Sequence, residues 1–182
     1  MNRRVHMKTA GQIVGIFALL VAIYSFQQRE RKGILFFQTI SCILFTTHFL
    51  LLGAYTGAAF NLIGLGRCLV FYHRGQKRWA SSPIWLAVFF VLILGTVVAT
   101  WDGVVTLFPT SAMFFTTVSL WVSKARFVRL LSLPSSPLWL IYNLINRSYA
   151  GILTESFMMV SILIAIVRFD ILGIKEPEPN NT

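Results

Sequence analysis

Long apolar runs, separated by short basic or glycine-containing segments, limit what this chain can fold into more than any other feature. A helix rises ~1.5 Å per residue and the hydrocarbon core of a bilayer is ~30 Å thick, so one crossing needs about 20 apolar residues. Seven such runs lie at 10–26, 33–53, 55–73, 82–100, 104–121, 127–147 and 149–168. Only 12% of the 182 residues are charged and 56% are hydrophobic, whereas about a quarter of a soluble domain is charged. The sequence therefore predicts an all-α protein that crosses the lipid bilayer seven times and has no soluble domain.

The two ends of the chain are predicted to be tails, at 1–9 and 169–182. The first run follows Arg3, Arg4 and Lys8 as in a signal peptide, but no small-residue cleavage site stands out and six more runs follow. We therefore interpret it as the first span. The last residues, Glu-Pro-Glu-Pro-Asn-Asn-Thr, cannot bury apolar surface, which predicts a disordered tail.

Basic residues gather in short clusters between the runs. They follow the first, third, fifth and seventh runs: Arg29, Arg31 and Lys32; Arg74, Lys77 and Arg78; Lys124 and Arg126; Arg168 and Lys175. With seven spans these segments share one face, which the excess of Lys and Arg predicts to be cytoplasmic, with the N-terminus outside and the C-terminus cytoplasmic. Arg3, Arg4 and Lys8 favour the opposite orientation, although Met7 is a second candidate start. The net charge of +10 thus reflects orientation, and without an RNA-binding signature we expect no nucleic-acid partner.

The sixth run differs from the others because it contains helix-breaking and polar residues. They are Arg129, Pro134, Ser135, Ser136, Pro137 and Asn143. Backbone groups freed by a break inside a membrane need protein or water as partners. The run therefore predicts a broken helix that lines a cavity.

An internal repeat emerges when the chain is shifted by 94 residues, which lays 10–73 on 104–168 and leaves 82–100 as a linker helix. Superimposed pairs are Ser25 with Ser119, Ser41 with Ser135, Tyr55 with Tyr149, Gly57 with Gly151, and Arg74 with Arg168. Three spans end on the opposite face, so one extra crossing lets a second copy enter in the same orientation. The pattern predicts two parallel three-helix bundles joined by a linker helix, an arrangement used by transporters with a site between the halves.

Two segments carry a resemblance to a known family. The stretch from Gln38 to Arg67, with His48-Phe-Leu-Leu-Leu-Gly-Ala-Tyr-Thr-Gly-Ala-Ala-Phe-Asn61, and the stretch from Ser136-Pro-Leu-Trp-Leu-Ile-Tyr-Asn143 through Glu155 resemble YgjV-type bacterial inner-membrane proteins. That family is similar in layout to the SWEET, PQ-loop and PnuC transporters. The resemblance implies an inner-membrane protein with a SWEET-like fold. PQ-loop proteins carry Pro-Gln in the first helix of each bundle, whereas this chain has only Pro109, in the second.

Glu155 is the sharpest candidate for a functional residue, because an ionisable group inside a span costs ~2.5 kcal/mol or more and usually faces a cavity or a partner. Its repeat mate is Asn61, and each lies six residues after the Tyr of a Tyr-x-Gly. The two are expected to face each other across the repeat axis and to bind hydroxyls or a cation. Alternatively, each forms a helix-to-helix hydrogen bond that only fastens the bundle.

Four further residues complete the predicted substrate site. His48 is a candidate proton carrier or a hydrogen-bonded packing residue, and its repeat mate Tyr142 lies near Trp139 and Asn143 on roughly one helix face. An aromatic ring beside polar groups suits a polar solute, although interface anchoring explains Trp and Tyr equally well.

Arg67 lies near the end of its span, where snorkelling to the interface is the favoured interpretation.

The sequence carries no signature of an enzyme, a cofactor or a metal site. Cys42 and Cys68 fall inside apolar runs and are treated as small hydrophobes. The favoured hypothesis is a transporter that moves a small polar solute by alternating access between two three-helix bundles. The alternative is a non-transporting interaction or assembly protein. The solute, its coupling to protons or ions, and a homo-oligomeric state stay open.

Overall fold

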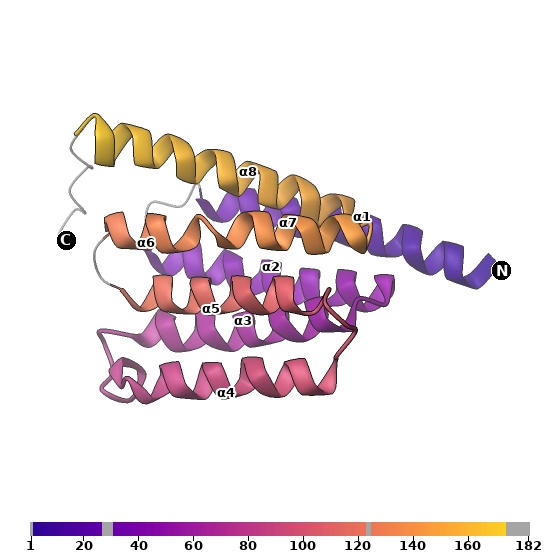
Figure 1. Ribbon diagram of the computed structural model, residues 1–182, viewed down its shortest axis with the longest axis horizontal. Helices are drawn as coiled ribbons and strands as arrows, with labels where there is room; N and C mark the ends of the chain where they lie inside the picture. The colour runs from indigo at the N-terminus through magenta and orange to yellow at the C-terminus, as the bar shows by residue number, and fades with distance from the viewer. Residues whose placement is uncertain (1, 27–30, 123–124, 174–182) are drawn as a thin grey trace.

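The computed structural model of the protein describes residues 2–26, 31–122 and 125–173, and the regular secondary structure within these ranges is helical. In chain order the helices are α1 (Asn2–Phe26), α2 (Arg31–Leu52), α3 (Tyr55–His73), the short turn η1 (Trp79–Ser81), α4 (Ile84–Ala99), α5 (Leu107–Trp121), α6 (Ala125–Ser132), α7 (Ser135–Ile145), α8 (Tyr149–Ala165) and the π-helical turn η2 (Ile166–Ile171). Since α6 and α7 follow each other along one line, the described helices form seven rods (Figure 1). The predicted all-α class and the seven helical segments are confirmed.

The rods lie side by side and alternate in direction along the chain, so that α1, α3, α5 and α8 run one way (Figure 1). Contacts between them close a ring, in which α1 packs on α2, α2 on α3, α3 on α5, α5 on α6 and α7, α7 on α8, and α8 on α1. Helix α4 lies outside this ring, against α3 and α5. Six rods therefore surround a common interior, and the fourth does not contribute to it.

The outer surface and the length of the helices suit a bilayer. Three helical stretches are long and apolar enough to cross one, namely His6–Ser25, Gly103–Trp121 and Tyr149–Ile171, while Phe36–Leu52 and Ile84–Ala99 are apolar but shorter. On α4, Val98 is 83% exposed. An apolar side chain at such a position costs nothing when the surrounding solvent is lipid. The outer surface of the helices is therefore suited to contact with lipid hydrocarbon.

The ends of the chain are more helical than the sequence predicts. Helix α1 begins at Asn2 and includes most of the predicted tail at 1–9. The seventh rod continues past residue 168 to Ile171 through η2, because apolar residues persist beyond Arg168 and add to the same helical surface. Residues 174–182, which hold most of the predicted disordered tail, lie outside the described residues.

The sixth rod is broken, as its sequence predicts. Pro134 lies between α6 and α7, and proline has no N–H to continue a helical hydrogen-bond ladder. Pro109, by contrast, lies in the first turn of α5, where proline is tolerated and breaks nothing. The proline break is therefore in the middle rod of the second half, whereas Pro109 leaves α5 unbroken.

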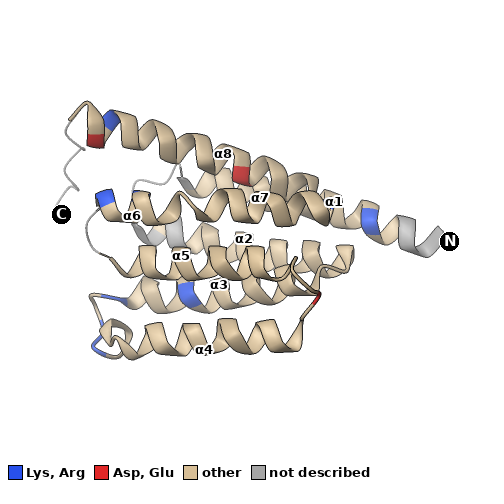
Figure 2. Ribbon diagram, viewed as in Figure 1, with Lys and Arg blue, Asp and Glu red and all other residues tan. Residues whose placement is uncertain are grey.

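The basic segments gather at one end of the ring. Figure 2 shows most of the lysines and arginines near the ends where α3 and η2 finish and α6 begins. Arg74, Arg126 and Arg168 belong to these ends. We call this the basic end. The side chains of Arg29, Arg31, Lys32, Lys124 and Lys175 lie outside the described residues.

Candidate functional site

A cavity of about 300 Å³ lies inside the ring of six rods. Its described lining comes from α1, α2, α3, α5, α6, α7 and α8 and includes no residue of α4. Its volume equals that of roughly ten water molecules in the liquid, at the lower end of the range for small-molecule sites. A solute of a few functional groups fits this space.

The lining residues come in pairs separated by the 94-residue offset. Ten such pairs account for twenty of the twenty-five lining residues: Ala22 and Thr116, Gln38 and Ser132, Ser41 and Ser135, Cys42 and Ser136, Phe45 and Trp139, Phe49 and Asn143, Phe60 and Thr154, Asn61 and Glu155, Gly64 and Met158, Cys68 and Ile162. Equivalent positions of α1, α2 and α3 on one side and of α5, α6/α7 and α8 on the other thus meet in one cavity. Apart from the residues already predicted for the site, the sequence offset does not indicate which of these pairs face inward.

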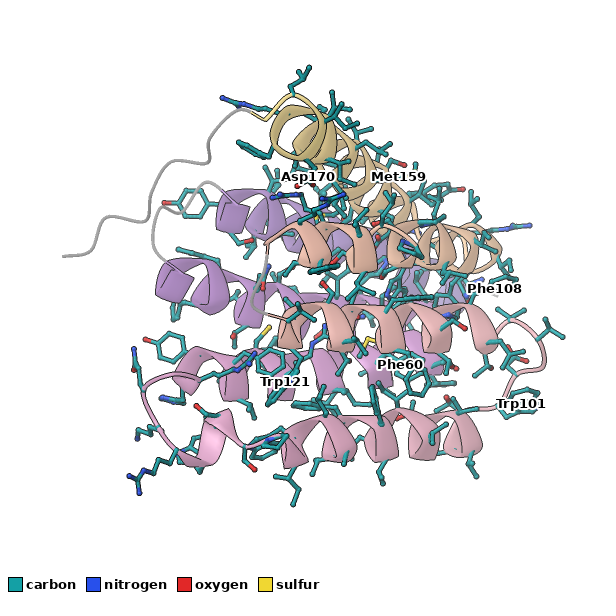
Figure 3. The ribbon with its side chains drawn as sticks, turned by 60° about the vertical axis from the view of Figure 1, so that its left-hand side comes forward. Phe60, Trp101, Phe108, Trp121, Met159 and Asp170 are labelled. Atoms are coloured by element: carbon teal, nitrogen blue, oxygen red, sulfur yellow. The ribbon has the colours of Figure 1, made fainter. Side chains whose placement is uncertain are left out.

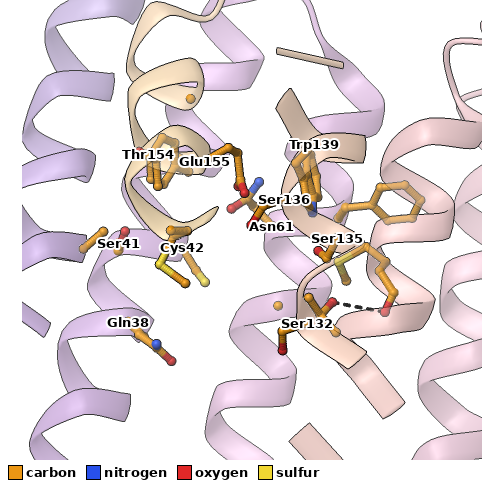
Figure 4. A pocket seen from close by; sticks show the side chains of 18 of the residues that line it. Gln38, Ser41, Cys42, Asn61, Ser132, Ser135, Ser136, Trp139, Thr154 and Glu155 are labelled. Atoms are coloured by element: carbon orange, nitrogen blue, oxygen red, sulfur yellow. Dashed lines mark hydrogen bonds between the residues drawn. The ribbon is translucent and has the colours of Figure 1, made fainter. Parts of the chain in front are cut away.

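Asn61 and Glu155 both face the cavity, as the repeat predicts. Asn61, on α3, donates its amide hydrogen to the Gly57 carbonyl oxygen (2.9 Å), which leaves its own amide oxygen to offer a solute. Glu155, on α8, has the Ser136 hydroxyl beside its carboxyl group. Figure 4 shows the three side chains grouped at the same level of the cavity. An amide and a carboxyl so placed can accept hydrogen bonds from hydroxyl, amide or ammonium groups.

Two more of the predicted site residues reach the cavity, both from α7. Trp139 places its ring in the wall, and Phe49 stacks on it with ring centroids 6.3 Å apart. Asn143 is 2% exposed, and its amide oxygen has no hydrogen-bond partner within the described part of the chain. A buried acceptor without a partner costs about 1–3 kcal/mol. A solute donor that reached Asn143 would recover this energy.

His48 and Tyr142 do not line the cavity; instead they join the two halves of the ring. The Tyr142 hydroxyl accepts a hydrogen bond from the Gly57 N–H (2.8 Å), in the first turn of α3. The His48 Nε2 lies 2.7 Å from the Ser148 hydroxyl, and that oxygen accepts the Gly151 N–H (3.2 Å) in the first turn of α8. These two links, which we call the clasps, connect equivalent positions in opposite directions.

The hydrogen bonds of His48 determine its tautomer. Its Nδ1 lies 2.7 Å from the carbonyl oxygen of Gly11 on α1, so Nδ1 carries the proton. In the neutral ring Nε2 is then an acceptor, and the Ser148 hydroxyl donates to it. A neutral, fully buried His48 therefore satisfies all its partners. This arrangement matches the packing interpretation and leaves no ring nitrogen for a solute.

The glycine of each Tyr-x-Gly allows the clasps to close. A Cβ atom on Gly57 would lie 2.9 Å from the Tyr142 ring, and one on Gly151 would overlap Asn143 and Ser148. Tyr55, the tyrosine of the first motif, is 65% exposed. The repeated motif thus marks a close approach of helices, and its tyrosine is not part of the site.

Arg67 lines the cavity, and the snorkelling interpretation is wrong. Its guanidinium turns inward from α3 and donates to the hydroxyls of Thr116 and Thr117 on α5, both at 3.1 Å. Its Nε is buried and has no partner among the described residues. Arg67 lies seven residues after Phe60, hence on the same helix face. That spacing becomes informative only once Phe60 is known to face the cavity.

Cys42 and Cys68 also line the cavity, beside Arg67. Their thiols lie close enough to interact with each other. In the described part of the chain no cluster of three or more metal-ligating side chains occurs. The two cysteines, predicted to be small hydrophobes, are therefore free thiols in the wall of a solute-sized space.

Comparison with known proteins agrees with this architecture of apolar helices. The chain matches the family model Imp-YgjV, a bacterial inner membrane protein, over residues 9–172. It is 27% identical over 158 residues to the inner membrane protein YgjV of Escherichia coli (strain K12), a match that covers 87% of this chain and 83% of that relative. No solved structure matches it significantly. The expected family is confirmed, and the chain belongs to the Imp-YgjV family of bacterial inner membrane proteins.

Proposed function

We propose that this inner-membrane protein transports a small polar solute by alternating access between two three-helix bundles. The bundles are α1 to α3 and α5 to α8, with α4 as the linker that lets the second bundle enter the membrane in the same orientation. The observation that carries the proposal is the paired lining of the cavity, with Asn61 and Glu155 at its centre. Transporters built from parallel repeats bind their solute at such an interface.

The clasps indicate which end of the cavity is closed. Both links lie at the end opposite the basic end, where α2 and α7 finish and α3 and α8 begin. The ring of Tyr142, which forms one clasp, packs on Phe49 and Trp139, and these two line the cavity. Alternating access then requires the two clasps to open while the basic end closes. The break between α6 and α7 gives the second bundle a place to bend.

Uptake measurements test the transport proposal directly. Purified protein in proteoliposomes is offered a mixed panel of sugars, nucleosides, amino acids and organic acids, and accumulation is measured by mass spectrometry. Glu155→Gln and Asn61→Ala should lower uptake about tenfold, since each removes a bond worth about 1.4 kcal/mol. Thr96→Ala on α4, outside the ring, is the matched control and should leave uptake unchanged.

Two results would contradict the proposal. One is no uptake of any solute by folded protein. The other is unchanged uptake per folded molecule in both variants together with lowered thermal stability in detergent, which would mean that the two side chains only fasten helices. Either result favours the interaction or assembly protein.

The basic end is expected to be cytoplasmic, with the N-terminus outside. A single cysteine at position 76, in a chain in which Cys42 and Cys68 are replaced by serine, tests this orientation. In intact spheroplasts it should resist an impermeant thiol reagent, whereas a single cysteine at position 102, at the opposite end, should react. The reverse pattern would invert the topology.

A further inference from the structure

Arg67 places a positive charge in the wall of the cavity without a carboxylate to neutralise it. Among the described residues the ion pair is Arg129 with Asp170, and it does not include Arg67. The partners of Arg67 are the uncharged hydroxyls of Thr116 and Thr117. A buried charge is costly unless it is paired. The guanidinium therefore has unused capacity to bind a negative group.

Glu155 does not supply that negative group. It is the acidic residue of the cavity lining, yet no ion pair within 4.0 Å joins it to Arg67. Along α3, Arg67 lies six residues from Asn61, or ~9 Å at ~1.5 Å per residue, and Asn61 is at the level of Glu155 (Figure 4). The cavity therefore has a cationic part beside Arg67 and a separate hydrogen-bonding part at Asn61 and Glu155.

Repeat symmetry does not require an arginine at this position. The residue that corresponds to Arg67 in the second half is Ser161, which is exposed and does not line the cavity. Arg67 is thus a feature of the first half alone. A charge without a counterpart in the second half, held inward by two hydroxyls, points to a ligand.

We propose that the solute is a small organic anion, whose carboxylate or phosphate pairs with Arg67 while its uncharged polar part lies toward Asn61 and Glu155. The inference rests on the proposed function, since it names the class of solute for that cavity. Guanidinium binds carboxylate and phosphate alike, often with two parallel hydrogen bonds. Asn143 and Trp139, which also line the cavity, would contact the rest of the molecule.

The two cysteines of the chain are built-in reporters for this charge, because both line the cavity beside Arg67. Natural protein in detergent is treated with an anionic sulfonatoethyl or a cationic trimethylammonium-ethyl methanethiosulfonate, and labelling of Cys42 and Cys68 is followed by mass spectrometry. Each rate is divided by the rate with a free thiol. The normalised rate should be about tenfold higher for the anionic reagent. At an intermediate effective dielectric constant, one nearby unit charge attracts an anion and repels a cation strongly enough to produce a ratio of this size.

Variants assign the preference to Arg67. Arg67→Gln should abolish it and Arg67→Lys should retain it. Arg74→Gln is the matched control, because Arg74 also extends from the end of α3 to α5, where it donates to Leu120 and Trp121 carbonyls, but does not line the cavity. It should label like the natural protein.

Competition with solutes distinguishes the two classes of anion. Inorganic phosphate and a dicarboxylate are each tested for protection of Cys42 and Cys68 against neutral N-ethylmaleimide, in the natural protein and in Arg67→Gln. If either anion protects the thiols in the natural protein and not in Arg67→Gln, the inference is supported. The anion that protects better is the preferred class.

The inference is overturned if the natural protein shows no anionic preference, or if the preference persists in Arg67→Gln. It can fail while transport stands, for instance when a neutral sugar is accumulated and the thiols show no charge preference. Conversely, the protein could transport nothing and still be labelled faster by the anionic reagent in a way that depends on Arg67. It would then be a membrane protein that binds anions without transporting them. If Arg67→Gln folds poorly, the natural chain can still overturn the inference by showing no anionic preference, and Arg67→Lys, compared with the Arg74→Gln control, still tests whether the charge at position 67 is sufficient.

Discussion

The first three and the last three rods of the ring differ in the continuity of their middle rod and in the residues that they place at the cavity. Helix α2 of the first half is continuous, whereas its counterpart in the second half is broken into α6 and α7 at Pro134. At the cavity the first half contributes Asn61 and Arg67, while the corresponding positions of the second half are Glu155 and Ser161. Under the proposed function, the paired positions would form the cavity wall and the positions that differ would determine which solute binds.

The clasps show the same division. Both connect the middle rod of one half to the first turn of the third helix of the other, but Tyr142 reaches its glycine directly and His48 reaches its glycine through Ser148. Figure 3 shows the rods with their side chains. His48 has an additional bond to Gly11, so the His48 clasp also holds α1. The Tyr142 clasp therefore has fewer hydrogen bonds to break than the His48 clasp.

The largest expected effect comes from filling the close approach at Gly151. Gly151→Ala should lower the free energy of unfolding by about 3 kcal/mol, because its Cβ would overlap Asn143 and Ser148. Gly57→Ala should cost less, since a Cβ there meets ring atoms of Tyr142 and Phe49 at 2.9 and 3.0 Å, which can shift. Thermal unfolding in detergent measures both.

The control for these two variants is Gly66→Ala, also on α3, where a Cβ would have no neighbour within 4 Å. It should be neutral or slightly stabilising, by up to about 1 kcal/mol, because alanine favours a helix over glycine. If Gly66→Ala destabilised the protein as much as Gly151→Ala, the close approach would not explain the effect.

Opening the clasps one at a time should have the next largest effect. Tyr142→Phe should cost about 1–2 kcal/mol, because it leaves the buried Gly57 N–H without its acceptor. His48→Ala should cost more, since it removes bonds to both Gly11 and Ser148. Chemical or thermal denaturation in detergent ranks the two.

Tyr149→Phe is the matched control for the tyrosine clasp, because Tyr149 is 63% exposed at the start of α8. It should change stability by less than about 0.5 kcal/mol. Equal effects of Tyr142→Phe and Tyr149→Phe would contradict the clasp.

Exchanging the central residues sharpens the comparison between the halves. Glu155→Asn gives both halves an amide and should lower uptake about tenfold, the equivalent of one hydrogen bond. The double variant Asn61→Glu, Glu155→Asn restores one carboxyl from the opposite side. If the positions are equivalent, it should recover part of the lost uptake, as flux in proteoliposomes would show. A folded double variant no better than Glu155→Asn would mean that the halves are not interchangeable at this site.

The smallest effect is expected at the ion pair that fastens the broken helix. Arg129 of α6 binds both carboxylate oxygens of Asp170 in η2, at 2.9 and 2.8 Å. The residue of the first half that corresponds to Asp170 is Gln76, which carries no charge. Asp170→Asn should lower the midpoint of thermal unfolding less than either clasp variant, and the difference should shrink in high salt. A loss larger than that of Tyr142→Phe would make this pair the main brace of the second half.

Several features of the fold follow from the sequence alone. The apolar runs predict the helical rods because a bilayer requires about 20 apolar residues for each crossing. Pro134 predicts the break because proline lacks an N–H. The repeated Tyr-x-Gly and the spacing from it correctly place Asn61 and Glu155 on the cavity wall. These predictions succeed because they depend on local chemistry and on a regular helical spacing.

The roles of His48, Tyr142 and Arg67 were decided by the tertiary structure. Each is a polar residue near the end of a span, and the sequence allows it to face a solute, a neighbouring helix or the interface. The choice depends on which groups the other half brings within hydrogen-bond reach: Ser148 for His48, Gly57 for Tyr142, and two threonines for Arg67. Helical spacing determines the direction in which a side chain points along its own helix, but the rotation of that helix against its neighbours is set by the packing of the whole ring.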